Sequence, residues 1–503
     1  MSIDKNGAGE CGTNLQAAAF RDSLARIVKP DCIVADRSVL DQYSSDGSFA
    51  PPGDALLLVY PETRAELQEI VRTARNSRMP LVPVSSGPPR FHGGTVPAQG
   101  AVMVNFSRMN HILNIDPVNR AVRVEAGVSY AQLIPELKKR GLKLNIPLLP
   151  RASKSVVASR LEREPALIPK YQFDYMDPLL TLEVVYGTGD DFRTGSASGP
   201  GALETLTADM VNPWGPGMID YSRFLSGAQG TMGFVTWAAT KVEVLPSLQK
   251  TYFIPIRDVG RLAAPMIGLL RQRVVDECLA LNNVNLATML AESWPSDFEE
   301  LRKNLPSWTV IVCIAGYRRR PDERVAIQER YLKEICAELR LEPQATLPGA
   351  EGNESAVLRL LSGPWEKEPY WKLRRRGSCH EIFFLTTLSK ADEFIRIMGE
   401  IAAEHHYPAD EMGSYVQPMV QGRGCHCEFS LPCDSTNPGE TAKVRKLFTT
   451  ASEALMKRGA FFSRPYGPWA DMVYSQFDGT SALKRLKGIF DPGNILNPGK
   501  LCF

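Results

Sequence analysis

Short apolar runs alternate with amphipathic stretches through the first half of the chain. The runs at 55–60, 81–84, 102–105 and 182–186 are bounded by turn residues, which is typical of buried strands. Between several of these runs, apolar residues recur three or four positions apart, as they do along one face of a helix. The pattern predicts a hairpin over 112–124 and helices over 13–29, from Pro61 to Ala74 and over 130–140. We expect the first of these helices to turn Leu15, Phe20, Leu24 and Ile27 inward.

The pattern changes after Pro246. Helices predicted over 258–273 and 321–339 alternate there with strands at 308–314, 380–388, 413–420 and 426–432. A last short helix over 482–489 precedes two Pro/Gly turns. We therefore expect an α+β fold with a separate domain at 248–459, which divides the remaining chain into an N-terminal part, 1–247, and a C-terminal return, 460–503.

Composition narrows the class of protein. The 503 residues allow two or three domains, and 44% hydrophobic and 23% charged residues are typical of a soluble globular protein. A formal charge of +2 gives no reason to expect nucleic acid or an anionic membrane as partner. No apolar run is long enough to span a bilayer, and no signal peptide precedes the first helix. We expect a cytoplasmic protein whose ten scattered cysteines are mostly reduced.

The segment Pro80–Pro97, PLVPVSSGPPRFHGGTVP, joins a strand to a loop of small residues. Such a loop lets main-chain N–H groups approach a ligand, and successive free N–H groups bind anions. Pro88 and Pro89 have no N–H group, so a cradle would use Ser85, Ser86, Gly87 and the residues from Arg90 onward. The segment matches neither the GxGxxG nor the Walker pattern. The alternative is a plain surface turn.

Two further segments favour a ligand. The glycine-rich stretch 227–233 stands directly before the strand predicted over 234–244, where it again permits close backbone approach. The segment 147–172 has weak periodicity and many small or polar residues, which is typical of a loop that covers a ligand. We expect main-chain cradles near Ser86 and Gly230 to approach a bound ligand.

Five segments, taken in order, carry a family resemblance. They are VYPETRAELQEIVRTAR, VPVSSGPPRFHGGTVP, VRVEAGVSYAQL, LSGAQGTMGFVT and IFDPGNILNPGK. Together they resemble the vanillyl-alcohol oxidase/p-cresol methylhydroxylase superfamily over essentially the whole chain. The resemblance implies FAD bound between two α+β subdomains, formed by 1–247 and 460–503. It also implies a cap domain with an antiparallel sheet at 248–459, which holds the substrate against the flavin.

Three shorter motifs, SSGPPRFHGG, SVVASRLER and SRPYGPWAD, resemble the vanillyl-alcohol oxidase/4-cresol dehydrogenase branch. Small hydroxylated side chains can bond flavin carbonyls without crowding the ring, although each serine is also an ordinary turn residue. A positive group near the flavin favours its reduced anion, a role that the resemblance gives to Arg464. The residues expected to contact FAD are Ser85, Ser86, Gly87, Pro88, Pro89, Arg90, His92, Ser153, Ser155, Ser159, Arg160, Gly230, Gly233, Val235, His426, Arg464, Asn497 and Lys500.

The chain departs from this branch where the branch binds phenolate. His92 stands at the first of two tyrosines, Ser463 stands at the second, and only the arginine, Arg464, remains. The expected acidic residue aligns near Gln172. An imidazole can bond an oxygen or take a proton near neutral pH, so His92 is a candidate catalytic residue, with a structural histidine as the alternative. Phenol oxidation therefore needs independent support.

A second cluster lies in CHCEFS, residues 425–430. On a strand, alternate residues share a face, which groups His426, Glu428 and Ser430 on one side. His380 and Glu381 are expected to add to this face from a neighbouring strand. The resemblance implies that His426 carries covalent FAD or faces the substrate, and noncovalent FAD stays open. The nearby cysteines lack CxxC spacing, so we predict no metal, although the resemblance to members that oxidise 2-hydroxy acids keeps a His/Glu metal site open as an alternative. Arg374–Arg376 is either an anion site or a solvated face.

These features lead to one main hypothesis, with alternatives. The main hypothesis is a FAD-dependent oxidase or dehydrogenase that takes a hydride from a benzylic or carbinol carbon of a small aromatic alcohol or alkylphenol. Its candidate catalytic residues are His92, Arg464, His426, Gln172 and Glu428. The alternatives are a D-lactate-like 2-hydroxy-acid dehydrogenase and a partner-dependent electron-transfer subunit. The resemblance also implies a homodimer, and a redox protein stays open as electron acceptor.

Overall fold

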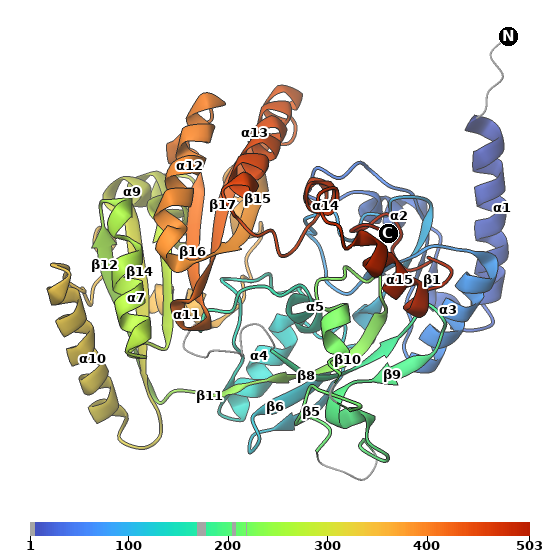
Figure 1. Cartoon of the computed structure of the whole chain (residues 1–503), viewed down its shortest axis with the longest axis horizontal. Helices are drawn as coiled ribbons and strands as arrows, with labels where there is room; N and C mark the ends of the chain where they lie inside the picture. Colours follow the sequence, from blue (N-terminus) through green and yellow to red (C-terminus); the bar gives the residue numbers. More distant parts are fainter. Residues whose placement is uncertain (1–5, 169–177, 204–207, 218) are drawn as a thin grey trace.

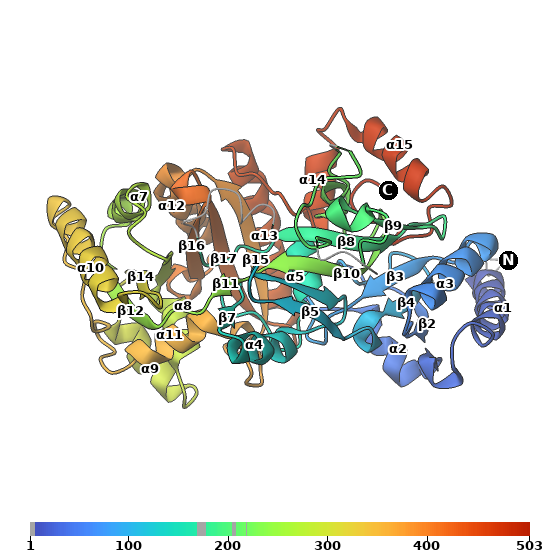
Figure 2. The same cartoon turned by 90° about the horizontal axis from the view of Figure 1, so that it is seen from below.

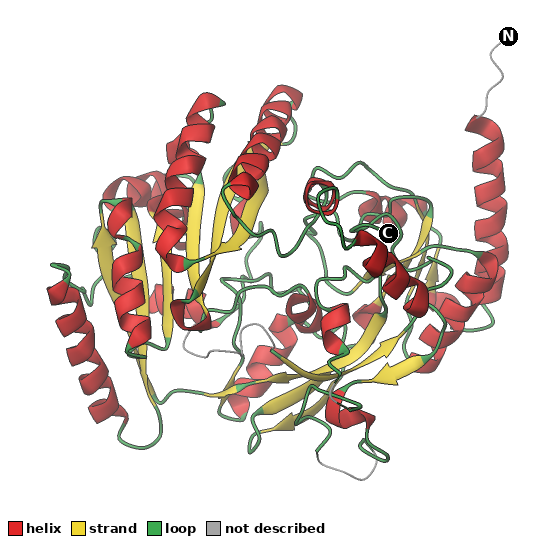
Figure 3. Cartoon of the chain, in the orientation of Figure 1, coloured by secondary structure: helices red, strands yellow, loops and turns green. Residues whose placement is uncertain are grey.

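The computed structural model describes residues 6–168, 178–203, 208–217 and 219–503. Helices and sheets occur in both halves of the chain, as expected for an α+β protein (Figure 3). Gln172 lies outside the described residues. None of the described helices combines the length and the apolar composition needed to cross a bilayer.

The first sheet has four strands. In spatial order they are β1 (Ile33–Val34), β2 (Ala55–Val59), β4 (Ala101–Asn105) and β3 (Leu81–Val84). The last three are parallel, and helices cover both faces: α1 (Asn6–Leu24) and α3 (Arg64–Ser77) on one, α2 (Arg37–Ser44) on the other. A capping box starts α3, because Thr63 Oγ1 accepts from Glu66 N at 3.2 Å and the Glu66 carboxylate accepts from Thr63 N. Leu15 of α1 is 69% exposed, so its predicted inward position is wrong, whereas Phe20 and Leu24 are buried.

The second sheet has five antiparallel strands. In spatial order they are β5 (Ile112–Asp116), β6 (Ala121–Glu125), β10 (Phe234–Lys241), β8 (Leu179–Val185) and β9 (Asp191–Arg193). The helices α4 (Tyr130–Lys139), α5 (Val156–Leu161) and α6 (Ser222–Leu225) pack against one face. The helix α5 lies inside the segment 147–172, which we expected to be irregular. The prediction missed this helix because α5 is too short to give a periodic pattern in the sequence. A small ribbon of β7 (Leu142–Lys143) and β11 (Glu243–Val244) leads to the next sheet.

The third sheet has six strands. In spatial order they are β12 (Leu248–Ile256), β14 (Trp308–Gly316), β13 (Glu277–Asn282), β16 (Gly413–Met419), β17 (Gly424–Asp434) and β15 (Gly377–Thr386). The helices α7 (Ala263–Arg271), α10 (Pro321–Glu338), α12 (Ala391–Glu404) and α13 (Pro438–Lys457) cover one face. The helices α8 (Asn283–Leu290), α9 (Ser296–Asn304) and α11 (Glu354–Ser362) cover the other face, over β12, β14 and β13.

The three sheets follow one another along the long axis of the molecule (Figure 2). The C-terminal tail, with α14 (Pro468–Tyr474) and α15 (Thr480–Phe490), returns from the six-stranded sheet to the N-terminal half (Figure 1). This path agrees with the division expected from the sequence, although the boundaries at 247 and 459 stay a prediction.

The end of the chain is tied to the first sheet. Buried Lys487 donates to Thr231 O at 2.6 Å and to Leu496 O at 3.0 Å, and it also contacts Asp491. Leu81 N donates to Ile495 O at 2.8 Å, which lays the tail beside β3. Asn497 Nδ2 then donates to the carbonyls of Gly94 and Gln229, so this terminal motif joins the two loops predicted to hold a ligand.

Candidate active site

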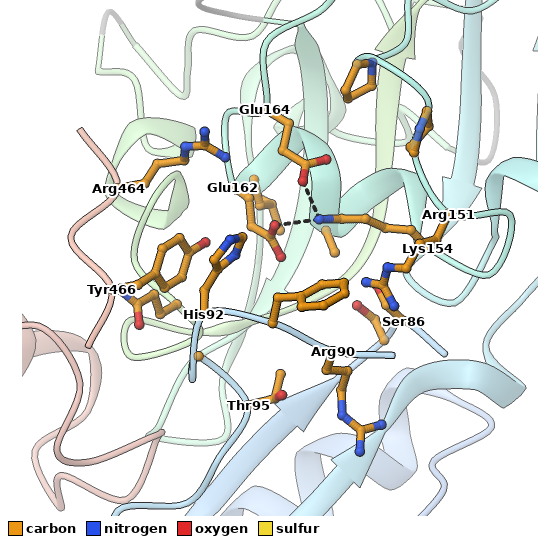
Figure 4. Close-up of a pocket in the computed structure, with 18 of the residues that line it drawn as sticks. Ser86, Arg90, His92, Thr95, Arg151, Lys154, Glu162, Glu164, Arg464 and Tyr466 are labelled. Carbon is orange, nitrogen blue, oxygen red and sulfur yellow. Dashed lines mark hydrogen bonds and ion pairs between the residues drawn. The ribbon is translucent and has the colours of Figure 1, made fainter. Parts of the chain in front are cut away.

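A large cavity lies between the loops of the N-terminal half and the uncovered part of the six-stranded sheet. Its loop side is formed by residues from 83–95, 147–165 and 225–235. Its sheet side carries Phe383 and Glu381 of β15, Glu428 of β17 and Tyr415 of β16. The tail contributes Arg464 and Tyr466 (Figure 4). The cavity therefore brings together segments that are up to about 380 residues apart in the sequence.

The loop after β3 divides into residues that face the cavity and residues that hold its shape. Ser85, Ser86, Arg90 and His92 line the cavity. Within the described chain, no hydrogen bond occupies the main-chain N–H groups of Ser86 and Arg90. Gly87, Pro88 and Pro89 instead bond to the 151–153 segment, in which Arg151 donates to the Gly87 and Pro89 carbonyls. Gly87 N also donates to Ser153 O at 3.0 Å.

The serines predicted in the second loop, at 153, 155 and 159, lie behind the cavity lining. Ser155 caps α5, accepting from Ala158 N at 3.0 Å, and it donates to Ala126 O at 2.6 Å. Ser159 bonds to Tyr130 and Glu164, and Arg160 donates to Asn145 O. None of Ser153, Ser155, Ser159 and Arg160 is among the residues that line the cavity. They position the segment rather than present their own polar groups.

Lys154, Glu162 and Glu164 line the cavity from this segment, and the sequence analysis missed them. Lys154 Nζ lies 2.7 Å from a Glu162 oxygen and 2.5 Å from a Glu164 oxygen (Figure 4). Burial alone would raise the pKa of Glu164, but the ammonium of Lys154 lowers it to about 2. The signal in the sequence was the charged run LERE inside the predicted ligand loop.

The glycine-rich loop packs closely on β3. Gly230 has φ +74°, and a Cβ at this position would lie 2.3 Å from Cγ of Pro83. Gly230, Gly233 and Val235 all line the cavity. Asn497 and Lys500 lie outside the lining, although Asn497 bonds to Gln229 O within this loop at 2.6 Å. The two predicted cradles thus face one cavity.

A chain of five side chains, buried or nearly so, crosses the sheet side of the cavity. At its centre, Lys372 Nζ contacts Glu381 and lies 2.6 Å from Oε1 of Glu428. The second oxygen of Glu381 lies 3.1 Å from His92 Nε2. The second oxygen of Glu428 lies 3.2 Å from His426 Nε2. The order is therefore His92, Glu381, Lys372, Glu428 and His426, and it links the loop after β3 to the sheet.

The charges in this chain stabilise one another. Burial would raise the pKa values of Glu381 and Glu428, but Lys372 holds both below the ordinary value. Burial would lower the pKa of Lys372, but the two carboxylates raise it well above its ordinary value. Burial lowers the pKa of His426, against the opposing effect of Glu428. The ion chain is therefore Glu⁻–Lys⁺–Glu⁻ with an imidazole at each end.

The strand β17 has the predicted alternation. Cys425, Cys427 and Phe429 pack on the helix-covered side, whereas His426 bonds to Glu428 on the other. His426 is 1% exposed and does not line the cavity. The prediction for His380 is wrong, because the strand period turns it away from Glu381 toward Phe49, whose ring stacks on it at 3.7 Å.

Arg464 provides the cavity with a buried cation that lies near Glu164 but forms no salt bridge with a described carboxylate. Its side chain is 7% exposed, and no described residue forms an ion pair with it. The guanidinium carbon lies 4.0 Å from the centre of the Phe383 ring, a cation–π contact. Tyr466, two residues further on, stacks on His92 with ring centres 5.1 Å apart. Ser463 is absent from the lining.

The arginines at 374–376 form contacts within the protein, and the residues considered for a metal site are not arranged as one. Arg374 donates to the carbonyls of Thr288 and Ala291, whereas Arg375 and Arg376 pair with Glu411. Among the described residues, no group of three His, Cys, Asp or Glu side chains is arranged to hold a metal ion. Lys372 stands between the two carboxylates that would be the best candidates.

Comparisons with known proteins agree with this geometry. Residues 55–159 match the FAD binding domain family. The glycolate oxidase subunit GlcD of Bacillus subtilis (strain 168) is 24% identical, over 91% of this chain and 91% of its own length. The flavoprotein subunit of 4-cresol dehydrogenase (hydroxylating) of Pseudomonas putida is 22% identical, over 87% and 86%. A crystal structure of p-cresol methylhydroxylase with substrate bound superimposes with a TM-score of 0.82, at 16% identity over 97% of both chains.

The chain contains a FAD binding domain and has the fold of p-cresol methylhydroxylase, in agreement with the resemblance noted in the sequence. The structural match confirms the p-cresol methylhydroxylase type of fold, and the FAD binding domain confirms the cofactor. The chain is a FAD-dependent oxidase or dehydrogenase.

The residues present fit FAD. The cavity that runs between the two cradles offers free main-chain N–H groups at Ser86 and Arg90 for the pyrophosphate. Thr95 lines the cavity, and its buried Oγ1 has no hydrogen-bond partner among the described residues. Oδ1 of Asn497, buried beside both loops, is likewise without a partner. A polar ligand in this cavity would satisfy the hydroxyl of Thr95.

Proposed function

We propose that this enzyme oxidises a small aromatic substrate with an acidic oxygen, taking a hydride from a benzylic or carbinol carbon. Arg464 carries the proposal, because it is a buried guanidinium that forms no salt bridge with any carboxylate in the described chain. A buried cation that lines a ligand cavity is most stable when an anionic group fills it. A phenolate or a carboxylate has the required charge.

The walls around Arg464 favour an aromatic ring. Phe383 lies under the guanidinium, and Tyr370, Tyr415 and Tyr466 complete an aromatic surround on the sheet side. Burial raises the pKa of Tyr466 well above its usual range, so its hydroxyl stays protonated and can donate to a substrate oxygen. Flat rings and one cation at the edge suit a substituted phenol or a benzylic alcohol.

FAD, when bound, supplies the acceptor for the hydride and its electron pair. The chain supplies the base. His92 lines the cavity, and its Nε2 faces the ionised Glu381, so we assign the proton of the neutral ring to Nε2. The Nδ1 atom then accepts the proton of the substrate hydroxyl, and Glu381 stabilises the imidazolium that forms. Lys372 keeps Glu381 ionised for this role.

The test is reduction of the purified, FAD-loaded protein without oxygen. A panel of 4-alkylphenols and benzylic alcohols is mixed with the enzyme, and the flavin absorbance is followed. We expect at least one aromatic substrate to bleach the flavin in a single turnover. Reduction by no aromatic compound, with full FAD content, would refute the proposed substrate class.

A second candidate is the oxidation of a small 2-hydroxy acid. It is favoured by the similarity to a glycolate oxidase subunit and by the ability of Arg464 to hold a carboxylate bidentately. Glycolate and the two enantiomers of lactate belong in the same panel. Because Lys372 stands between Glu381 and Glu428, we expect chelators to leave either activity unchanged.

We further propose noncovalent FAD and a protein electron acceptor. Noncovalent FAD is supported by the hydrogen bond from His426 to Glu428, which leaves Nε2 occupied. Acid precipitation should release the flavin into the supernatant.

The protein electron acceptor is suggested by the relative that is a flavoprotein subunit. Faster turnover with dyes than with oxygen would support it. The homodimer and the cytoplasmic location stay predictions, and gel filtration tests the first.

A further inference from the structure

A second, smaller cavity lies behind the His92–Glu381 pair. It shares His92, Glu381 and Tyr466 with the main cavity, and it extends to Gly467, which is exposed. The space open to the centres of water molecules is about 40 Å³. One water needs about 10–15 Å³ of such space, so the cavity has room for two or three waters. The remaining walls come from Gly47–Ala50, the start of β15, α13 and α14. It therefore leads from the protein surface to the back of the proposed base.

His380 faces this cavity with ring nitrogens that are open to water rather than enclosed by protein. The residue is 8% exposed, and its ring stacks on Phe49 with ring centres 3.7 Å apart and planes 10° apart. No described residue forms a hydrogen bond with either ring nitrogen. Buried polar atoms are nearly always paired with protein or with ordered water. Water in the adjacent cavity is the partner that this geometry allows.

The charges around His380 leave its ring neutral. Burial, with a smaller contribution from Arg445, lowers the pKa of His380 to about 4 against the effects of Glu381 and Asp46. Arg445 of α13 also lies over the Phe49 ring, at 5.1 Å. Asp46 orders the loop above the cavity, because it accepts from Ser48 N at 2.9 Å and from Gly93 N at 2.7 Å. A neutral imidazole can accept a proton at one nitrogen and release one at the other.

We propose that this cavity holds water bonded to His380 and Glu381, and that this water carries the substrate proton from the His92–Glu381 pair to the surface. The inference rests on the proposed function. In each turnover the substrate O–H bond breaks and an N–H bond forms on His92. One proton then leaves through the water and His380 to bulk solvent. The electron pair moves with the hydride to FAD, and none moves along this route.

The first experiment is independent of activity. Crystals of the FAD-loaded protein and of His380→Phe are compared at high resolution. The variant keeps a ring on Phe49 but removes both nitrogens. We expect ordered water between His380 and Glu381 in the unchanged protein, and we expect the water bonded to residue 380 to be lost in the variant. A dry cavity in the unchanged protein would overturn the proposal even if the enzyme is active.

The second experiment follows the proton itself. A pH indicator in weak buffer reports proton release during a single turnover, while absorbance reports flavin reduction. We expect His380→Phe and the cavity-filling Ala50→Leu to slow proton release at least fivefold relative to flavin reduction. Added imidazole should restore release in His380→Ala. The control His405→Ala, at the end of α12, should behave as the unchanged protein.

Each result has a defined meaning. Equal proton release in His380→Phe and the unchanged protein refutes the exit route. A failure of every substrate to bleach FAD refutes the proposed function instead, and the crystallographic comparison then still decides whether the cavity holds water.

Discussion

The two sides of the active-site cavity are built by different means. The loop side presents small residues and main-chain groups at 85–95 and 227–235, and its shape depends on backbone hydrogen bonds. The sheet side presents long charged side chains and aromatic rings, and its shape depends on ion pairs between distant elements. The loop side can hold a constant cofactor with few side-chain requirements. The sheet side can change its ligand by changing a few side chains.

Substitution of Gly230 by valine tests the loop side and should have the largest effect. A β-branched residue is strained at φ +74°, and its Cβ would lie 2.3 Å from Pro83 Cγ. We expect a loss of more than about 3 kcal/mol in the free energy of unfolding and loss of bound FAD. Urea unfolding and flavin absorbance measure both.

The matched control is Gly399→Ala. Gly399 lies within α12, where a Cβ would contact nothing within 4 Å. We expect this change to stabilise the protein by about 0.5–1 kcal/mol and to leave the flavin content unchanged. Normal FAD content in Gly230→Val would contradict the close-packed cradle.

Substitution of Lys372 by methionine tests the sheet side. It leaves two buried carboxylates without their shared cation, which costs about 3–5 kcal/mol in the free energy of unfolding. Urea unfolding at pH 7 measures the change. When Glu381→Gln and Glu428→Gln are already present, adding Lys372→Met should lower the free energy of unfolding much less. Lys250→Met, at a half-exposed pair with Glu329, should cost less than about 1 kcal/mol.

Substitution of Arg464 by glutamine separates binding from stability. No described ion pair is lost, so we expect a change in the free energy of unfolding of only about 1 kcal/mol, from the contact with Phe383. The efficiency of flavin reduction should fall about 10- to 100-fold, which corresponds to a lost charged hydrogen bond of about 1.5–3 kcal/mol. Arg458→Gln on the surface is the control. An equal loss of stability and activity would argue against a role in binding.

Substitution of Glu164 by glutamine has an effect that depends on pH. The pKa of Glu164 is about 2 in the folded protein and 4.5 ordinarily, so its stabilising effect is present above pH 4.5 and is lost as pH falls toward 2. The free energy of unfolding falls between pH 5 and pH 2 in the unchanged protein. In the variant we expect this fall to be smaller by about 1–3 kcal/mol. Glu329→Gln, at a more exposed pair, should change this difference less. If the free energy of unfolding falls equally steeply with pH in Glu164→Gln and in the unchanged protein, the buried pair of Glu164 with Lys154 is contradicted.

The fold was largely predictable from local patterns. The strands β2, β3 and β4 and the helices α3 and α4 fall where period and turn residues predicted them, because each depends on residues close in the sequence. The error at Leu15 arose because a helical pattern does not show which part of the helix packs against the sheet and which part lies in solvent. The short helix α5 gave too few residues for a periodic signal.

The candidate site was predictable only in part. Ser85, Ser86, His92, Gly230 and Arg464 line the cavity, whereas Ser155, Ser159 and His426 lie behind it. Motif similarity aligned these segments, but it did not show which side of a loop each residue occupies. Lys154, Lys372 and Tyr466 were missed, because an isolated lysine or tyrosine in a sequence resembles any surface residue.

The sequence by itself determined the type of fold, the cofactor and the two glycine- and proline-rich loops that face the cavity, because glycine, proline and small residues act on the backbone immediately around them. Only the tertiary structure decided that Lys372 lies between Glu381 and Glu428, and that His92 meets a carboxylate 289 residues away. Ion pairs depend on the meeting of surfaces from distant elements, and no spacing along the chain encodes that meeting.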